Sequence, residues 1–286
     1  MTRHGPCVLD NIAGPHEPGL ATKDRAQYYR PAALPGVEAL HASFVTHRYT
    51  AHVHESWTIA AVDDGAATFE LENSRHVAPA GTTFLIPPGA VHTGEPATPD
   101  GYRYRVLYLS QRDWGSAEAS PHTFDRKSPV VVRHEALAEH LARLHRGLSA
   151  PGVSLEQGEL LCSVSAVIAT LHVQGERPKT PVRPRVVAEA VAYIHAHVVE
   201  DFSLHDLASA VQSSPYHLAR VFHRHVGMPP AHYRRALRVL AAQRLLCSGE
   251  RPADVALACG FYDQSHLNRH FKSIVGVTPT QYLRAS

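Results

Sequence analysis

The fold of this chain is decided by residues 260–272, GFYDQSHLNRHFK. Gly260 supplies a turn, and Asp263 is the kind of residue that caps the first turn of a helix. Leu267 and Phe271 follow at helical spacing and give that helix an apolar face, while the residues between them are polar. The stretch therefore predicts a turn followed by an amphipathic helix.

The same pattern occurs twice in the C-terminal part of the chain. In the first copy Ser203 and Asp206 fit a capping box, which predicts a short helix over residues 204–211. Ser214, followed by a proline, begins a longer helix, and Gly227 ends it. Five positions of the first copy recur 49 residues later, as Leu218/Leu267, Phe222/Phe271, Gly227/Gly276, Pro230/Pro279 and Tyr233/Tyr282. Two copies of a helix-turn-helix are predicted.

The longer helix of each copy has a packing face and a polar face. In the first, we expect the packing face to hold Leu218, Val221, Phe222 and His225, and the polar face Tyr216, Ala219, Arg220 and His223. In the second, we expect Leu267, Phe271 and Ile274 to pack, leaving Gln264, Ser265, Asn268, Arg269 and Lys272 exposed. Arginine, asparagine and glutamine are the residue types that read base edges in a major groove. A solvated helix surface explains either helix alone, but the repetition favours DNA binding.

A further helix joins the two copies over residues 231–247. Its spacing places Tyr233, Leu237, Leu240 and Leu245 inward and Arg234, Arg235, Arg238 and Arg244 mainly outward. A helix of this length spans about 25 Å. It could hold two recognition helices in successive major grooves, about 34 Å apart. We expect its arginines to contact phosphate, with one or two making structural ion pairs instead.

These stretches resemble the AraC/XylS family of transcription regulators. The resemblance rests on SPYHLARVF at residues 214–222, PPAHYRRALR at residues 229–238, and GFYDQSHLNRHFK followed by GVTP at residues 276–279. It implies double-stranded DNA and RNA polymerase as partners, and an activator. It also implies base-reading positions at Tyr216, Ala219, Arg220, Gln264, Ser265, Asn268 and Arg269. Ala219 departs from the larger polar residue often found there, so we expect less direct readout from the first helix.

The N-terminal part predicts a small antiparallel β barrel or sandwich. Strand patterns with Gly and Pro turns between them cover residues 43–49, 57–62, 68–72, 82–86 and 102–109. Two patterns resemble the cupin fold: HVH at residues 52–54 with Gly65 downstream, and Gly81 followed after five residues by PPGAVH at residues 87–92. The resemblance implies a cupin-like sensor domain.

A barrel mouth is a natural site for a small molecule. Our candidates for its lining are His52, His54, Trp57, His92, Tyr102 and Tyr104. Ordinary core packing is the alternative for each aromatic residue, and the alternation over residues 102–109 leaves open which face is inside. The three histidines could ligate a metal, but the glutamate that cupin enzymes add is replaced by Thr58 or Ile59. We expect an unidentified small-molecule effector and no metal or cofactor.

The chain is expected to be an α+β protein of two domains. Residues 174–184, QGERPKTPVRP, carry three prolines among polar residues and predict a linker. The predicted divisions are a cupin-like sensor and dimerisation domain over 1–174, a linker over 175–184, and an all-α DNA-binding domain over 185–286. Apolar stripes at Leu137, Leu141, Leu144, Leu148 and at Leu161, Val164, Ile168, Leu171 predict helices. These helices pack on the barrel, or they form the homodimer interface that the family resemblance implies.

Composition limits the function classes. With 44% hydrophobic and 19% charged residues, the 286-residue chain is globular rather than disordered. The first twenty residues lack a signal peptide and no apolar run could cross a bilayer, so we expect a cytoplasmic protein without membrane contact. Residues 185–286 hold 11 Lys and Arg against 7 Asp and Glu, whereas the remainder holds 17 against 19. The DNA-binding part is therefore modestly basic.

Three functions remain open on the sequence alone. We expect a ligand-responsive, sequence-specific regulator without catalytic residues. The alternatives are a metal-dependent cupin enzyme fused to a DNA-binding module, and a ligand-independent regulator whose barrel is only a scaffold.

Overall fold

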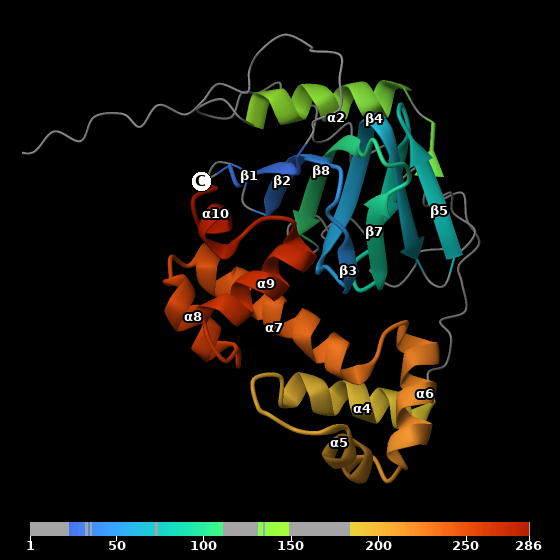
Figure 1. Ribbon diagram of the computed structural model, residues 1–286, viewed down its shortest axis with the longest axis vertical. Helices are drawn as coiled ribbons and strands as arrows, with labels where there is room; N and C mark the ends of the chain where they lie inside the picture. Colours follow the sequence, from blue (N-terminus) through green and yellow to red (C-terminus); the bar gives the residue numbers. More distant parts are fainter. Residues whose placement is uncertain are drawn as a thin grey trace, which may run out of the picture.

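The computed structural model describes residues 23–31, 34, 36–71, 74–110, 131–133, 135–148 and 184–285. Within these ranges a strand domain (residues 23–148) is followed by a helical domain (residues 184–285), and the two domains touch (Figure 1). The expected α+β architecture is confirmed. In this part of the chain, no helix has the length and apolar character needed to cross a membrane. The predicted linker lies outside the described residues except for Pro184.

The strand domain is built from antiparallel strands. Their bounds are β1 Arg25–Tyr29, β2 Val37–Phe44, β3 Tyr49–His52, β4 Ser56–Leu71, β5 Ser74–Pro79, β6 Thr83–Ile86, β7 His92–Pro96, β8 Tyr102–Ser110 and β9 Val131–Val132. The order is β1-β2-β8-β4-β6-β9, with β5 and β7 on β4 and β3 on β7. The first part of β4 pairs with β8 and β6, and its last part pairs with β5 and β7. This long strand therefore connects the two halves of the sheet.

Two strand predictions need correction. The strand predicted at residues 43–49 is wrong, because β2 ends at Phe44 and β3 begins at Tyr49. The turn between them is held by Asp24, whose Oδ1 accepts hydrogen bonds from the amides of Val45 (2.7 Å) and Thr46 (2.8 Å). The strands predicted at 57–62 and 68–72 are a single strand, which continues through a bulge at residues 62–64 and a left-handed Gly65.

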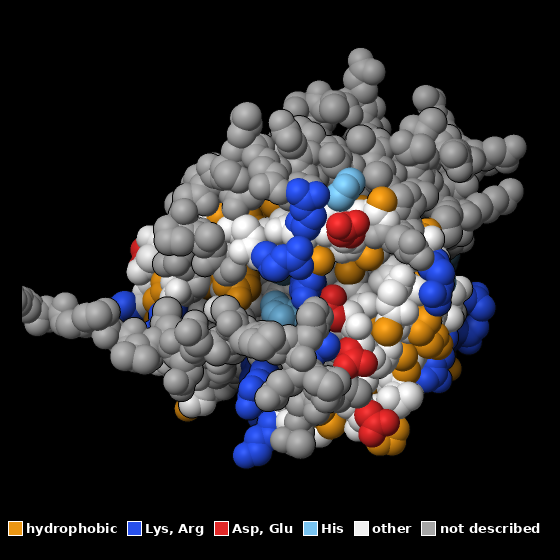
Figure 2. Space-filling view, turned by 90° about the horizontal axis from the view of Figure 1, so that it is seen from above, with side chains coloured by type: hydrophobic (Ala, Val, Ile, Leu, Met, Phe, Trp, Pro, Cys, Tyr) orange, Lys and Arg blue, Asp and Glu red, His pale blue; other side chains and the backbone are white. Residues whose placement is uncertain are grey.

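Helix α2 (Glu135–Leu148) covers one face of the sheet (Figure 1). Its stripe of Leu137, Leu141, Leu144 and Leu148 is buried against a layer that includes Ile59 and Leu107. The buried His145 ring fixes the helix further, because its Nε2 donates to the carbonyl of Val106 at 2.8 Å. Figure 2 looks onto this side of the molecule and shows basic and acidic side chains mixed together. Packing within the chain is confirmed for this stripe, whereas residues 161–171 lie outside the described ranges.

The helical domain contains the two predicted units. Its helices are α4 Arg185–Ala196, α5 Leu204–Ala210, α6 Pro215–Val226, α7 Pro230–Cys247, α8 Pro252–Ala258, α9 Gln264–Val275 and α10 Pro279–Leu283. The predicted caps are present: Ser203, Ser214 and Asp263 accept from amides in the first turns of α5, α6 and α9. Gly227 and Gly276 end α6 and α9 in the left-handed conformation, at φ 91° and 86°. The repeat in the sequence is thus a repeat in the structure.

Arg238 on α7 differs from its prediction. It was expected on the outer side of the helix, but it is only 7% exposed. Its guanidinium donates to four backbone carbonyls, those of Val198 (2.8 Å), Val199 (3.1 Å), Glu200 (3.0 Å) and Gly260. Val198–Glu200 follow α4, whereas Gly260 makes the turn between α8 and α9. Arg238 therefore ties the two helix-turn-helix units together.

Candidate DNA interface and ligand cavity

The polar face of α6 is largely open to solvent. Tyr216 is 77% exposed, Arg220 and His223 are also exposed, and Ala219 is half-buried. The opposite face packs through Leu218, Phe222 and Val226. His225 was expected on this packing face, but it is exposed. The buried stripe continues at a spacing of four to Val226 and so leaves His225 outside.

On α9 four of the five predicted reading residues point away from the core, whereas the side-chain oxygen of Asn268 is buried. Gln264, Ser265, Arg269 and Lys272 are exposed, and Asn268 is half-buried. The helix touches the strand domain with another side, where Ser273 and Gly276 lie near β3. Tyr262 precedes the helix and is 86% exposed. Sequence reasoning missed Tyr262, although an aromatic residue directly after the Gly260 turn could have been noticed.

The arginines of α7 divide into different roles. Arg234 donates to the carbonyls of Glu200 (3.1 Å) and Phe202 (3.2 Å), and Arg244 pairs with Glu55 of the strand domain. Burial first, and then the neighbouring charge of Arg269, lowers the pKa of Arg235. Arg235 is thus the member of this set that adds positive charge beside α9.

A small cavity of about 40 Å³ lies inside the strand domain. Its wall consists of Tyr49, His52, His54, Thr58, Ala67, Thr68, Phe69, Phe84, Ile86, His92, Thr93, Gly94, Tyr102, Tyr104, Val106 and Tyr108. In this conformation it has room for about three water molecules, so an ion or a very small ligand fits without rearrangement.

The structure brings together all the predicted lining residues except Trp57. Trp57 pairs with Leu109 across the strands and packs on the α2 side of the sheet, so its placement in the lining was wrong. Alternation along β4 explains this, since the cavity side is taken by the next residue, Thr58. The tyrosine face of β8 is the inner one. On its other face Arg103 and Arg105 pair with Asp64 (3.6 Å) and Asp63 (3.2 Å).

The cavity also contains residues that the sequence did not single out. The Tyr49 hydroxyl lies 2.8 Å from that of Tyr104, and the ring of Tyr108 lies 5.2 Å from the ring of His54. Tyr108 continues the alternation from Tyr102 and Tyr104, so that pattern could have found it. Tyr49 was missed because the strand containing it was predicted in the wrong place. Burial raises the pKa of these tyrosines, which keeps them protonated.

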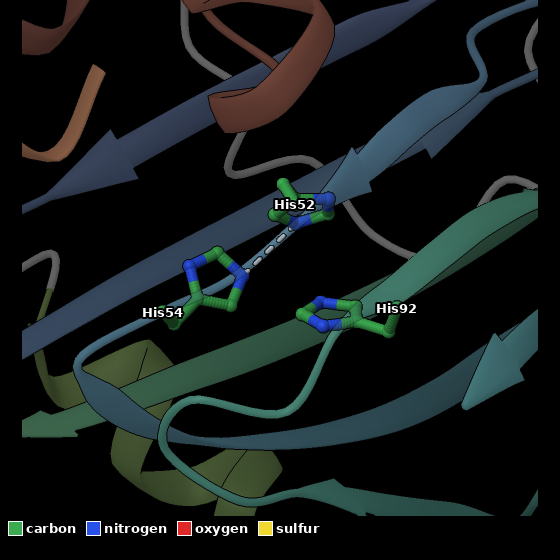
Figure 3. Close-up of side chains that lie close together, drawn as sticks. All are labelled: His52, His54 and His92. Carbon is green, nitrogen blue, oxygen red and sulfur yellow. Dashed lines mark hydrogen bonds between the residues drawn. The ribbon is translucent and has the colours of Figure 1, made fainter. Parts of the chain in front are cut away.

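Three imidazoles converge on the cavity (Figure 3). His52 is the last residue of β3, His92 is the first of β7, and the two are cross-strand partners. His54 comes from the loop between β3 and β4. One ring nitrogen from each histidine lies within 4.8 Å of the other two. Desolvation lowers the pKa of His52 and His54 well below the usual value and that of His92 to about 4, so all three rings are neutral at pH 7.

The ends of both α6 and α9 lie against the strand domain. A Cβ built on Gly227 would lie 3.3 Å from Cγ1 of Val91, the neighbour of His92. A Cβ built on Gly276 would lie 2.5 Å from the hydroxyl of Tyr49 in the cavity wall. The interface is also held by the Tyr282 hydroxyl, which donates to Glu38 at 2.7 Å. The cavity wall therefore contacts the end of α9 through Tyr49, and the residue beside the wall residue His92, Val91, contacts the end of α6.

Two repeated helices with exposed polar faces, attached to a domain with an internal cavity, define a DNA-binding regulator with a sensor domain. Comparisons with known proteins support this class. Residues 34–164 match the model of the AraC-like ligand binding domain, and residues 207–285 match a helix-turn-helix domain. The chain belongs to the AraC family of transcriptional regulators.

Relatives cover both domains. The transcriptional activator AarP of Providencia stuartii is 30% identical, over 39% of this chain and 84% of AarP. The arabinose operon regulatory protein of Escherichia coli is 25% identical over 71% of each chain. Among solved structures, fatty-acid-bound ToxT of Vibrio cholerae has a TM-score of 0.54 at 14% identity, covering 92% of this chain and 95% of that one. This last likeness shows a shared fold.

Proposed function

We propose that this chain is a transcription activator whose DNA binding is controlled by a small effector in the cavity of the strand domain. The observation that carries the proposal is the placement of the cavity. Its wall contacts the C-terminal end of α9 through Tyr49, and Val91, the neighbour of the wall residue His92, contacts the C-terminal end of α6. The exposed faces of these two helices hold the predicted base-reading residues. Sensor and DNA-reading elements are thus in direct contact within one chain.

The proposed control acts through Tyr49 and Val91. Tyr49 has its hydroxyl bonded to Tyr104 inside the cavity and close to Gly276 outside it. An effector that repositions Tyr49 changes the free energy of this contact, and with it the population of arrangements open to α9. The effector changes this population only if its affinity differs between the positions that α9 can take relative to the strand domain.

Arg269 provides the direct test of base reading. Arg269→Ala is expected to weaken binding to the preferred DNA sequence by about 1–3 kcal/mol and to relax the base preference at one position. The preferred sequence would first be selected from random duplexes with the wild-type chain. Affinities for this duplex and a scrambled one would then be measured by fluorescence anisotropy at one salt concentration.

Two further variants serve as controls for Arg269. Arg235→Ala, which removes positive charge beside α9, is expected to weaken both duplexes alike. Arg251→Ala removes an exposed arginine paired with Asp254 on α8 and is expected to leave both affinities near wild type. An equal loss on the preferred and scrambled duplexes for Arg269→Ala would refute base reading by this residue.

We expect the regulator to act as a homodimer in the cytoplasm. The stripe on α2 is used within the chain, which leaves the helix predicted over residues 161–171 as the proposed dimer surface. Sedimentation equilibrium at micromolar concentration is expected to show a dimer. Monomer alone, with and without effector, would contradict it. We also propose that the sensor domain ends at residue 174 and that the DNA-binding domain begins at residue 185. The regulator is further proposed to contact RNA polymerase.

The enzyme alternative receives less support from the cavity. Cupin enzymes add a glutamate to such histidines, and the described lining holds no carboxylate. Among the relatives, AarP is a transcriptional activator and the Escherichia coli protein is an operon regulatory protein. We therefore propose that the chain is not an enzyme.

A further inference from the structure

Hydrogen bonds to backbone carbonyls fix the tautomers of two of the three cavity histidines. The Nδ1 atom of His52 lies 2.7 Å from the carbonyl oxygen of Thr50, and that of His92 lies 3.0 Å from the carbonyl oxygen of Ala90. In each case the ring donates Nδ1–H to the residue two positions earlier. This hydrogen bond fixes the tautomer and leaves Nε2 unprotonated, as a metal ligand must be. In His52 this atom accepts a hydrogen bond from Nε2–H of His54, a bond that a bound ion would replace.

The distances between the rings fit a shared ion. Nε2 of His52 and Nε2 of His54 are 3.1 Å apart, and all three candidate nitrogens lie within 4.8 Å of one another. Imidazole nitrogens that share a tetrahedral zinc ion at about 2.0–2.1 Å are about 3.3 Å apart. Small rotations of the His54 and His92 side chains therefore bring the three nitrogens to bonding distance. His54 is half-buried and lies in a loop, which makes it the ring best able to adjust.

A second observation comes from Thr58. Its hydroxyl lines the same cavity and is buried, yet it has no hydrogen-bond partner among the described residues. An unsatisfied buried hydroxyl costs about 1–3 kcal/mol, which a ligand in the cavity would recover. Thr58 can donate to a water or an anion bound beside the histidines.

We propose that His52, His54 and His92 bind one divalent transition-metal ion such as Zn²⁺, with a fourth position open to the cavity. Three neutral imidazoles leave the ion with its full charge of two. No carboxylate lies in the described part of the lining, so the open position favours hydroxide or a small anion, with Thr58 as a donor to it. The effector would then belong to the class of small oxygen-donor anions, such as carboxylates. The metal site stands independently of the DNA-binding proposal.

The test uses the full-length chain freed of metal by a chelator. Titration with Zn²⁺ in a calorimeter is expected to show one tight site per chain. Loading with Co²⁺ is expected to give the intense visible bands of a four-coordinate ion, and adding acetate is expected to shift those bands. X-ray absorption of the zinc form counts the imidazole ligands without any variant, and three is the expected number.

Variants separate this site from the many other histidines. His52→Ala and His92→Ala are expected to weaken zinc binding at least ~100-fold. His76→Ala, a half-buried histidine stacked on Phe69 in the same domain, is the matched control and is expected to bind as wild type. Circular dichroism checks that each variant folds. Zinc binding absent from the wild-type chain, or unchanged in folded His92→Ala, would overturn the proposal. Either result leaves the Arg269 measurement unaffected, so the two proposals fail separately.

Discussion

Arg238→Ala is expected to destabilise the helical domain by about 3–5 kcal/mol and to abolish specific DNA binding at physiological temperature. The guanidinium satisfies four carbonyls from segments that no other described side chain joins in this way. Alanine removes these bonds and the packing of the buried arginine side chain, and of the four carbonyls Glu200 keeps a bond from Arg234. The two units would then lose the connection that fixes the relative placement of α6 and α9.

Urea unfolding followed by far-ultraviolet circular dichroism measures this effect, because the signal comes mainly from helices. Arg251→Ala is the matched control, since its exposed ion pair with Asp254 contributes within ~0.5 kcal/mol. Arg238→Lys keeps the charge but has one donor nitrogen, and it is expected to recover only part of the loss. Wild-type stability of Arg238→Ala would contradict the structural role assigned to this arginine.

Gly65→Ala is expected to destabilise the strand domain by about 3–4 kcal/mol, combining left-handed strain with a steric overlap. Gly65 has φ 69°, and a Cβ there would lie 2.2 Å from the carbonyl oxygen of Gly101. Because that oxygen belongs to the backbone, relief requires β4 to move away from the turn before β8. The effect should appear in tryptophan fluorescence, since both tryptophans, Trp57 and Trp114, precede the helical domain.

Gly89→Ala isolates the contribution of backbone strain. Gly89 has a similar φ of 74°, but a Cβ there would meet nothing within 4 Å. Gly89→Ala is expected to lower the free energy of unfolding by about 1 kcal/mol, from the left-handed conformation alone. Equal unfolding midpoints for the two alanine variants would mean that the steric overlap with Gly101 does not contribute to the destabilisation by Gly65→Ala.

The helical domain could be predicted well because its signals are local. Capping by Ser203, Ser214 and Asp263 depends on residues three positions apart, and the duplication checks each assignment against its copy. The three histidines could also be predicted as a group, since two short motifs contain them. Their meeting required β3 to pair with β7, which the spacing of the motifs implied only through family resemblance.

The remaining features depend on contacts between distant segments. Helical periodicity assigns Arg238 to a polar side, but it cannot foresee that the segment after α4 and the Gly260 turn close over that side. Trp57 was misplaced because alternation along β4 has two possible phases, and the phase is set by packing against α2. The role of Tyr49 depends on its contact with Gly276, more than 200 residues later in the chain.

The hydrogen bonds between Arg30 and the last described residues have a consequence for biosynthesis. Arg30 donates through Nη2 to the carbonyl of Tyr282 (2.6 Å) and through Nε to that of Ala285 (3.1 Å), across separations of 252 and 255 residues. It directly follows β1, the strand at the edge of the sheet, and α10 lies beside that strand (Figure 1). Edge strands invite pairing with other chains. During translation the contacts of α10 with Arg30 and β1 form only after the ribosome has made α10, so the nascent sensor domain folds at first without them.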